Sequence, residues 1–193
     1  MNPSNAPLII LDRDGVINHD SDDYIKTPDE WVPIPRSLEA IARLTHAGWS
    51  IAVATNQSGV ERGLFDINDL HAIHNKMMAA VAAAGGRIDA IFFCPHAPDA
   101  GCDCRKPAAG LLRDISARFN RGLVNVPVVG DSLRDLKAGL EMDCALWLVK
   151  TGKGLRTLAA AEHDGDKSLP ANTHIADDLF DAVDAILKSA HTA

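Results

Sequence analysis

Two carboxylates that lie one residue apart, Asp12 and Asp14, follow the short apolar run Leu8–Leu11. The end of a buried strand is an unfavourable place for two acids unless a cation offsets their repulsion. Paired acids can divide the work of phosphoryl transfer, because one can attack phosphorus while the other protonates the leaving oxygen and later deprotonates water. Asp-x-Asp-Gly is also common in solvated turns, so this motif alone predicts no catalytic site.

A second group of acids follows another apolar run, since Asp131 comes after Val126–Val129 and Asp135 lies one helical turn later. Carboxylate oxygens suit Mg²⁺, a hard cation that usually keeps several waters and is completed by substrate phosphate. Asp135 could instead be only a first-turn acid that complements the helix dipole, and both alternatives stay open. For Ser132 we favour a helix cap over a catalytic role, although it is also a candidate substrate contact.

Donors for phosphate oxygens occur at two other places in the chain. Thr55 and Asn56 offer a hydroxyl, an amide and backbone N–H groups in a turn that leads through Gly59, which is the kind of nest that receives phosphate. Lys106 brings a positive charge to the same edge of the sheet if its connection folds back, where it can stabilise transition-state charge. By itself Lys106 would be a surface cation ahead of Pro107, but the motifs at the other strand ends favour a role in the site.

Three of the four cysteines lie with a histidine in the segment 94–104. Cys94-x-His96 followed by Cys102-x-Cys104 matches a closed tetrahedral Zn²⁺ site, and protein ligands at all four positions indicate a structural role. A redox function for Cys102 and Cys104 is the alternative, but it gives no reason for Cys94 and His96. The segment directly precedes Arg105 and Lys106, so zinc would fix the loop that presents both cations.

Two other features suggest no further site. Cys144 is expected to be a small buried side chain near a strand. His71 and His74 lie three residues apart on an expected helix, but no acid or cysteine partner accompanies them, so a solvated helix face is the expectation.

Apolar runs rich in β-branched residues alternate with segments of helical period, which predicts a βαβαβαβαβα order. The strands are expected at 8–11, 51–54, 88–93, 126–129 and 145–149, and 152–161 is expected to be a surface connection. This order predicts a doubly wound, Rossmann-like, mostly parallel sheet with helices on both faces. Such sheets bind ligands beyond the carboxyl ends of their strands, which is where the motifs above occur.

The composition is that of a globular protein, with 193 residues, 47% hydrophobic residues and a formal charge of −7. One domain over residues 1–193, with a zinc loop at 94–104, is expected for this length. The chain has no cluster of Lys and Arg residues, so we do not expect a nucleic-acid partner. The chain shows neither a secretory signal nor an apolar run long enough for a membrane helix, so we expect a cytoplasmic location and no membrane partner. A monomer is the expected state.

Taken together, Asp12-x-Asp14, Thr55, Lys106 and Asp131 with Asp135 resemble the four ordered motifs of haloacid-dehalogenase-like (HAD-like) phosphatases over roughly residues 8 to 150. The resemblance implies a HAD-like fold and a Mg²⁺-dependent phosphatase that acts through an aspartyl-phosphate at Asp12. Asp14 would be the acid/base, and Thr55 and Lys106 would hold the phosphoryl group. Mg²⁺ would be bound by the Asp12 carboxylate, the Asp14 backbone carbonyl and Asp131. No insertion is large enough for a separate cap domain.

Within this superfamily the segments 11–18, 55–59 and 102–107 look like the branch of heptose-bisphosphate and histidinol-phosphate phosphatases, to which the zinc loop also belongs. The segment 55–65 looks most like the enzymes that remove the 7-phosphate of heptose bisphosphate, in the synthesis of precursors for lipopolysaccharide or related glycans. The resemblance implies a phosphorylated sugar as the substrate. The implied substrate contacts are Asp20, Asp23, Tyr24, Asn56, Gln57, Ser58 and Arg105.

Two alternatives remain open at the level of sequence. Only five residues separate His96 from Cys102, and this short zinc loop favours a histidinol-phosphate phosphatase. A zinc-stabilised module that binds a phosphorylated ligand without turnover is the alternative from another class. The presence of both Asp12 and Asp14 argues against it, because a binding module needs neither a nucleophile nor a proton donor.

Overall fold

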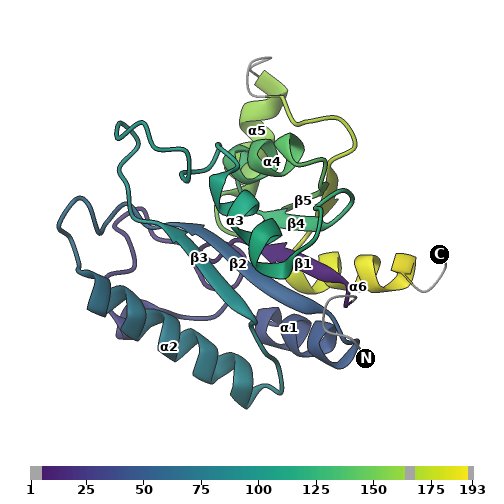
Figure 1. The fold of residues 1–193 in the computed structure, drawn as a ribbon, viewed down its shortest axis with the longest axis horizontal. Helices are drawn as coiled ribbons and strands as arrows, with labels where there is room; N and C mark the ends of the chain where they lie inside the picture. The colour runs from purple at the N-terminus through teal and green to yellow at the C-terminus, as the bar shows by residue number, and fades with distance from the viewer. Residues whose placement is uncertain (1–5, 164–167, 191–193) are drawn as a thin grey trace.

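A six-stranded parallel sheet in the order β3-β2-β1-β4-β5-β6 organises the protein, as the computed structural model of residues 6–163 and 168–190 shows (Figure 1). The order confirms the predicted doubly wound α/β class, because strands are added first on one side of β1 and then on the other. The strands are β1 Leu8–Leu11, β2 Ser50–Asn56, β3 Ala90–Cys94, β4 Pro127–Gly130, β5 Ala145–Val149 and β6 His174–Ala176.

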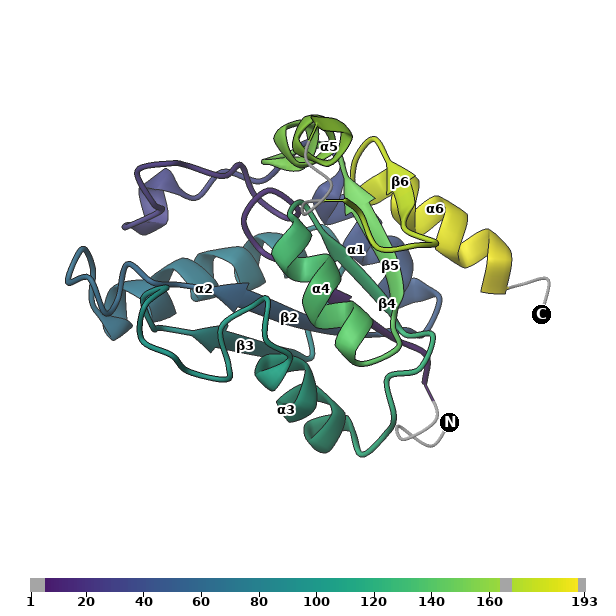
Figure 2. The same ribbon diagram turned by 90° about the horizontal axis from the view of Figure 1, so that it is seen from above.

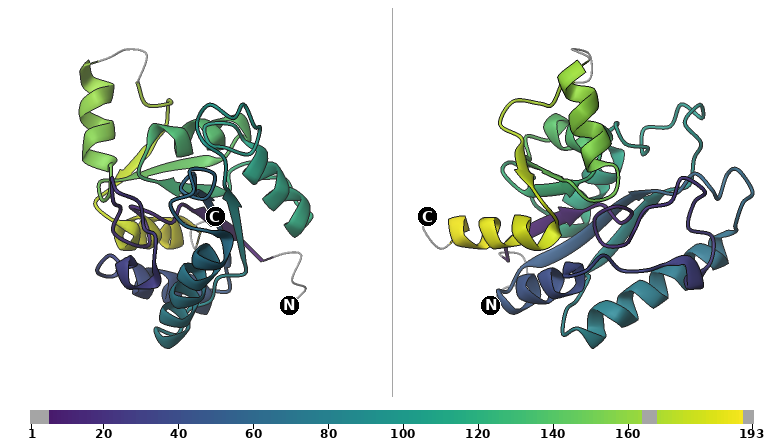
Figure 3. Two further views of the ribbon diagram at one scale, coloured as in Figure 1. Left: turned by 90° about the vertical axis from the view of Figure 1, so that its left-hand side faces the viewer. Right: turned by 180° about the vertical axis from the view of Figure 1, so that it is seen from behind.

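Helices cover both faces of this sheet, and Figure 2 shows α1 and α6 on the side opposite to α3. In the described residues the helices are α1 Ser37–His46, α2 Ile67–Ala83, α3 Gly110–Phe119, α4 Leu133–Glu141, α5 Gly154–His163 and α6 Leu179–Ala190, with a 3₁₀ turn, η2, at Pro28–Glu30. Figure 3 shows α2 and α5 at opposite ends of the molecule. The layers follow the predicted alternation of apolar runs and helical periods.

The central strand β1 is buried along its whole length, which explains why its sequence is a continuous apolar run. Ile9 and Leu11 belong to the core cluster that includes α1, α2 and α6. Leu8 and Ile10 belong to the cluster that includes α3 and α4. Because alternate side chains enter opposite cores, the strand cannot slip by one residue without exchanging both sets of contacts.

The carboxyl ends of β1 and β4 lie almost level with each other, and β2 runs on beside them to Asn56. Leu11 is in register with Val53 of β2 and with Val129 of β4, and the Asp12 N–H donates to the carbonyl of Val129 at 2.9 Å. Strand order reverses between β1 and β4, which is where a doubly wound sheet leaves a crevice for ligands. The residues that follow these strands are therefore gathered at one edge.

Two predictions about the C-terminal part were wrong. Residues 152–161 are not a surface connection, because most of them belong to α5. Only Gly154 of this helix is buried, Leu155 is exposed and Leu158 is partly buried, so its apolar face is too small to distinguish the helix from a connection. The strand β6 was also missed, since its three residues at the sheet edge are too few for an alternating pattern. The expected absence of a large cap is confirmed for the segment between β1 and α1, where η2 is the only helical element described.

Candidate active site and zinc cluster

Lys106 lies at the centre of a buried group of charges at the carboxyl edge of the sheet. Its Nζ is 3.0 Å from Asp12 Oδ1 and 2.5 Å from Asp135 Oδ1, and it donates to the carbonyl of Ala54 at 2.6 Å. Burial alone would lower the pKa of Lys106, but the two carboxylates outweigh burial and raise it. Lys106 is therefore a permanently charged ammonium held between the ends of β1, β2 and β4.

The carboxylates of Asp12, Asp131 and Asp135 form a cluster in which one oxygen of each lies within 4.8 Å of the others. Burial, with the neighbouring acids adding to it, raises the pKa of Asp12 to about 7 and that of Asp131 to about 8. The pKa of Asp135 is lowered despite its burial, because Lys106 lies beside it. A divalent cation would relieve the repulsion in this oxygen-rich group, so the donor set fits Mg²⁺.

Asp14 faces a different set of partners from Asp12. Each oxygen of its carboxylate accepts two hydrogen bonds: Oδ1 from Arg13 Nε at 3.0 Å and Asn18 at 2.8 Å, and Oδ2 from Arg13 Nη2 and Gln57, both at 2.9 Å. Burial opposes the charge, but these donors outweigh it and lower the pKa of Asp14. The two acids of the first motif thus have opposite pKa shifts, raised for Asp12 and lowered for Asp14.

A cavity of about 280 Å³ opens over these acids. Of the sequence-predicted site residues it is lined by Asp12, Asp14, Asp20, Tyr24, Thr55, Asn56, Gln57, Ser58, Arg105, Lys106, Asp131 and Ser132, together with Asp135. Asp23 is not among the lining residues and is exposed. Residues from five separate stretches of the sequence therefore meet in one cavity.

The side-chain amides of Asn56 and Gln57 are engaged with the protein itself. Asn56 accepts from the Lys106 N–H at 3.1 Å and donates to the Lys106 carbonyl at 2.9 Å, so it holds the backbone of Lys106 in place. Gln57 Nε2 lies 2.9 Å from Asp14 Oδ2 and 2.8 Å from Thr55 Oγ1. Their predicted role as substrate contacts stays a prediction, while the structure assigns both amides contacts inside the site.

The start of α4 engages both acids that follow β4. Ser132 stands at the N-cap, as predicted, and its N–H and hydroxyl donate to Asp135 Oδ2 at 3.0 and 2.5 Å. Asp135 therefore joins the helix start to Lys106, and it also belongs to the carboxylate cluster.

Sequence reasoning missed several residues of this cavity, including Arg62, Arg134 and Lys153. Lys153 is notable because its N–H donates to Asp131 Oδ2 at 2.7 Å and its Nζ lies 2.5 Å from Asp20. The glycines around Lys153 were a usable signal, since a Cβ at Gly152 would collide with the Asp131 carboxylate. Arg134 follows Ser132 on an exposed helix turn and has no comparable signal in the sequence.

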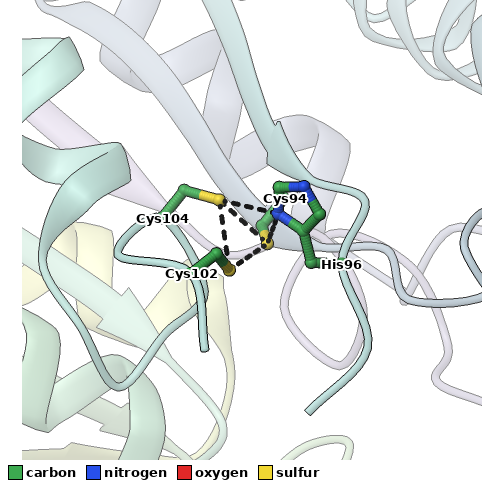
Figure 4. Close-up of side chains that lie close together, drawn as sticks. All are labelled: Cys94, His96, Cys102 and Cys104. Atoms are coloured by element: carbon green, nitrogen blue, oxygen red, sulfur yellow. Dashed lines mark hydrogen bonds between the residues drawn. The ribbon is translucent and has the colours of Figure 1, made fainter. Parts of the chain in front are cut away.

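The four predicted zinc ligands converge on one point, as Figure 4 shows. The Sγ atom of Cys104 lies 3.1 Å from that of Cys94, 3.5 Å from that of Cys102 and 3.2 Å from His96 Nδ1. Ligands about 2.1–2.3 Å from a tetrahedral zinc ion are separated by distances of this order, so three thiols and one imidazole fit Zn²⁺. None of the four cysteines forms a disulfide.

The zinc cluster is connected to the cations that follow it. Arg105 Nη1 donates to the carbonyl of His96 at 3.0 Å, and the Ala97 N–H donates to the Glu61 carboxylate. No helix or strand is present between β3 and α3, so these contacts and the metal ligands are what define the path of the loop. The prediction that the cluster supports Arg105 and Lys106 agrees with this connectivity.

The arrangement of strand ends, acids and a buried lysine is that of a HAD-like hydrolase. A family model described as HAD-hydrolase-like matches residues 103–182. The D-glycero-beta-D-manno-heptose-1,7-bisphosphate 7-phosphatase of Bordetella bronchiseptica is 55% identical over 95% of this chain and 99% of its own length. The enzyme of the same name from Pseudomonas aeruginosa is also 55% identical, over 94% of this chain and 98% of its own length.

Solved structures give the same result. A crystal structure of D,D-heptose 1,7-bisphosphate phosphatase from B. bronchiseptica, complexed with magnesium and phosphate, aligns with a TM-score of 0.90 at 54% identity over 95% of this chain and 99% of that one. The corresponding enzyme from Burkholderia thailandensis aligns with a TM-score of 0.73 at 48% identity, over 94% of this chain and 98% of that one. The chain therefore belongs to the D-glycero-beta-D-manno-heptose-1,7-bisphosphate 7-phosphatase family within the HAD-like hydrolases, and it is a phosphatase.

Mg²⁺ binding should release protons and weaken as the pH falls. Asp12 and Asp131 have pKa values of about 7 and about 8, so both carboxyls are largely protonated at pH 6 and must lose protons to bind the cation. Below these values the apparent affinity should fall by up to about tenfold per pH unit for each proton displaced. Isothermal titration calorimetry in buffers of different ionisation enthalpy measures both the number of protons released and the apparent affinity for Mg²⁺. An affinity that is the same at pH 6 and pH 8 would contradict the assignment.

Cys102→Ser should remove zinc and destabilise the fold. Loss of one thiolate opens the tetrahedral site, so we expect the zinc content to fall well below one per chain and the free energy of unfolding to drop by about 3 kcal/mol or more. Activity should fall indirectly, since Arg105 and Lys106 lose their support. Metal analysis and denaturant unfolding provide the measurement. Cys144→Ser, outside the cluster, is the matched control and should keep its zinc. Full zinc content in Cys102→Ser would refute the assignment.

Proposed function

We propose that this enzyme hydrolyses the 7-phosphate of D-glycero-D-manno-heptose 1,7-bisphosphate by way of a phosphoryl group carried on Asp12. The observation that carries the proposal is the placement of Asp12 at the end of β1, 3.0 Å from the buried Lys106 and in the same cluster as Asp131, in a chain 55% identical to phosphatases of that name. The names of those relatives specify the β anomer, so both anomers belong in the assay.

The cofactors follow from the two ligand sets. Mg²⁺ would be held by Asp12, Asp131 and the backbone carbonyl of Asp14, with Asp135 in the same cluster. When bound, this cation neutralises negative charge on the phosphate and on the acids. Zn²⁺ would be held by Cys94, His96, Cys102 and Cys104, and would act on the reaction only by supporting the loop that carries Arg105 and Lys106.

The first chemical step transfers the phosphoryl group. A carboxylate oxygen of Asp12 attacks phosphorus, the bond from phosphorus to the C7 oxygen breaks, and the leaving oxygen takes a proton from Asp14, which has to enter this step protonated although Arg13, Asn18 and Gln57 lower its pKa. Lys106 Nζ and the Thr55 hydroxyl donate to the equatorial oxygens, where negative charge accumulates. Thr55 is buried and its Oγ1 is fixed by Gln57 at 2.8 Å, so its position is set before substrate arrives.

The second step restores Asp12. Asp14, now a carboxylate, takes a proton from water, and that water attacks phosphorus and displaces the Asp12 carboxylate. Inorganic phosphate leaves, and the two steps together consume one water and return every group to its starting form. Asp14 is suited to this task because Arg13, Asn18 and Gln57 all stabilise its ionised form.

The second phosphate of the substrate would find its counter-charge on two arginines. Arg105 and Arg134 both line the cavity, and among the described residues neither forms a salt bridge with a carboxylate. Burial and then the proximity of Arg134 lower the pKa of Arg105, which indicates an uncompensated concentration of positive charge. A dianionic group at the far end of a phosphorylated sugar relieves it.

Other parts of the proposal concern the protein as a whole. We expect one catalytic domain over residues 1–193, acting as a cytoplasmic monomer without a nucleic-acid partner, in the synthesis of heptose precursors for lipopolysaccharide or related glycans. No helix of the described residues has the length and apolar character needed to cross a membrane.

Asp12→Asn should abolish turnover while leaving the fold and the zinc intact. An amide of the same shape cannot act as the nucleophile, so kcat should fall by at least about 10³-fold. Released phosphate, zinc content and thermal unfolding are the measurements, with Asp114→Asn on the exposed face of α3 as the control. Retention of most turnover by Asp12→Asn would overturn the covalent mechanism.

The substrate assignment is tested by comparing heptose 1,7-bisphosphate with histidinol phosphate. Because Arg105 and Arg134 favour a second anionic group, kcat/KM should be at least about tenfold higher for the bisphosphate, which corresponds to about 1.4 kcal/mol. Phosphorus NMR of the product should show that the anomeric phosphate is retained. A preference for histidinol phosphate, the substrate favoured by the short zinc loop, would sink the assignment.

A further inference from the structure

A buried chain of hydrogen bonds runs from α2 into the active site, and the mechanism above leaves its outer member unused. His74 was expected on a solvated helix face, but this was wrong: its side chain is buried, whereas His71 is exposed. His74 Nε2 lies 3.3 Å from Arg13 Nη1, and its ring meets the edge of Phe93 with centroids 6.0 Å apart. This contact could not be predicted from local pattern, because Arg13 lies 61 residues away in the chain.

Arg13 is the link between His74 and the site. Its guanidinium is only 1% exposed and holds Asp14 through two parallel bonds, from Nε at 3.0 Å and from Nη2 at 2.9 Å. The same Nη2 donates to Gln57 Oε1 at 3.1 Å. A guanidinium presents its donors in one rigid plane, so a contact that fixes the Nη1 edge also fixes the direction of the other donors.

The orientation of the Gln57 amide follows from Arg13. Because Gln57 Oε1 accepts from Arg13, its Nε2 must be the atom that faces Asp14 and Thr55. Two side chains that handle the phosphoryl group and the proton, Thr55 and Asp14, are thus held by groups that Arg13 orients. The position of one buried cation controls both.

The protonation state of His74 is fixed by this geometry. Arginine has only donors, so His74 Nε2 must accept, and the ring must be the neutral form that carries its proton on Nδ1. Burial and then the charge of Arg13 lower the pKa of His74 to about 3, in agreement with a neutral acceptor. No other titratable group on α2 is buried beside Arg13 in the described residues, since His71 is exposed.

We propose that His74 is a positioning residue for proton transfer: it fixes the plane of the Arg13 guanidinium, which in turn aims the Asp14 carboxylate at the leaving oxygen. This inference rests on the proposed function, because it takes Asp14 as the proton donor. Misplacement of a catalytic group by a fraction of an ångström can cost one to two orders of magnitude in rate. A residue that only fills space between α2 and the site would have no such selective effect.

The test uses the difference between leaving groups. An alkyl phosphate such as the sugar substrate needs protonation of its poor leaving oxygen, whereas dinitrophenyl phosphate does not. For His74→Leu, kcat/KM on the alkyl ester should fall by about ten- to a hundredfold, and on the dinitrophenyl ester by less than about threefold. The ratio of the two values is independent of the active fraction of each preparation, so partial misfolding cannot imitate the effect.

Two matched variants sharpen the measurement. His74→Gln places an amide oxygen near the position of Nε2 and should restore the ratio to within about threefold of wild type. His71→Leu, one turn away on the exposed face of the same helix, should leave it unchanged. If kcat/KM of His74→Leu falls equally on both esters, or falls on neither, the ratio stays at its wild-type value and the inference is overturned.

The variant Asp14→Asn distinguishes failure of the proposed function from failure of this inference alone. If Asp14→Asn shows the split between the two esters and His74→Leu does not, the proton donor stands and the inference alone is overturned. If Asp14→Asn shows no split, the assignment of the donor fails and the inference fails with it. Nitrogen-15 NMR of the histidine rings provides a readout apart from activity: the His74 resonances, identified by their loss in His74→Gln, should show an unprotonated Nε2. A proton on Nε2 would rule out the contact with Arg13.

Discussion

The charge balance around Lys106 is the constraint on which the active site depends. Three carboxylates, Asp12, Asp131 and Asp135, share a buried edge with this one ammonium, so three negative charges against one positive leave an excess of two. Burial and mutual repulsion raise the pKa of Asp12 to about 7 and that of Asp131 to about 8, so both carboxyls take up protons more readily than an exposed aspartate does. Buried ion pairs seldom add to stability, because desolvation offsets their attraction. Their presence here is consistent with the proposed function, in which they would bind a divalent cation and a phosphoryl group.

The loop between β3 and α3 has to hold Lys106 in this position without the help of secondary structure. It does so through two independent supports. On one side, Asn56 makes a donor and an acceptor contact with the backbone of Lys106, in the manner of a neighbouring strand. On the other, the ligand cluster at Cys94, His96, Cys102 and Cys104 closes the loop, and Arg105 returns to the carbonyl of His96. Metal ligands that close a short loop can hold two cations in position, whereas a longer loop would need a hydrophobic core of its own to do so.

The parts of this structure that depend on local pattern were predictable, and the parts that depend on distant contacts were not. The apolar run at 8–11 predicted a buried parallel strand, and the acids after it predicted the position of the site, because a parallel strand buried on both faces is a nearly continuous apolar run. The helix α5 and the strand β6 escaped, since neither buries enough to leave an apolar period. Conversely, His74 lies four residues after Leu70 and three before Met77, on the buried face of α2, so the helical period could have shown that His74 and not His71 is buried. The contact of His74 with Arg13 could not be predicted, because the two residues are 61 positions apart.

The helix α5, which was not predicted from the sequence, contributes directly to the site. The N–H of Lys153, just before α5, donates to the Asp131 carboxylate, and Thr157 in its first turn donates to the Asp131 carbonyl at 2.9 Å. Lys153 Nζ also reaches Asp20, in the loop after β1. In a protein without a cap domain, the wall of the cavity must come from such loops. The start of α5 thus fixes a candidate metal ligand through its backbone and the substrate-facing loop through a side chain. Because α5 lies on the surface and has few packing contacts of its own, the contacts with Asp131 and Asp20 hold the start of α5 in place as much as they support the site.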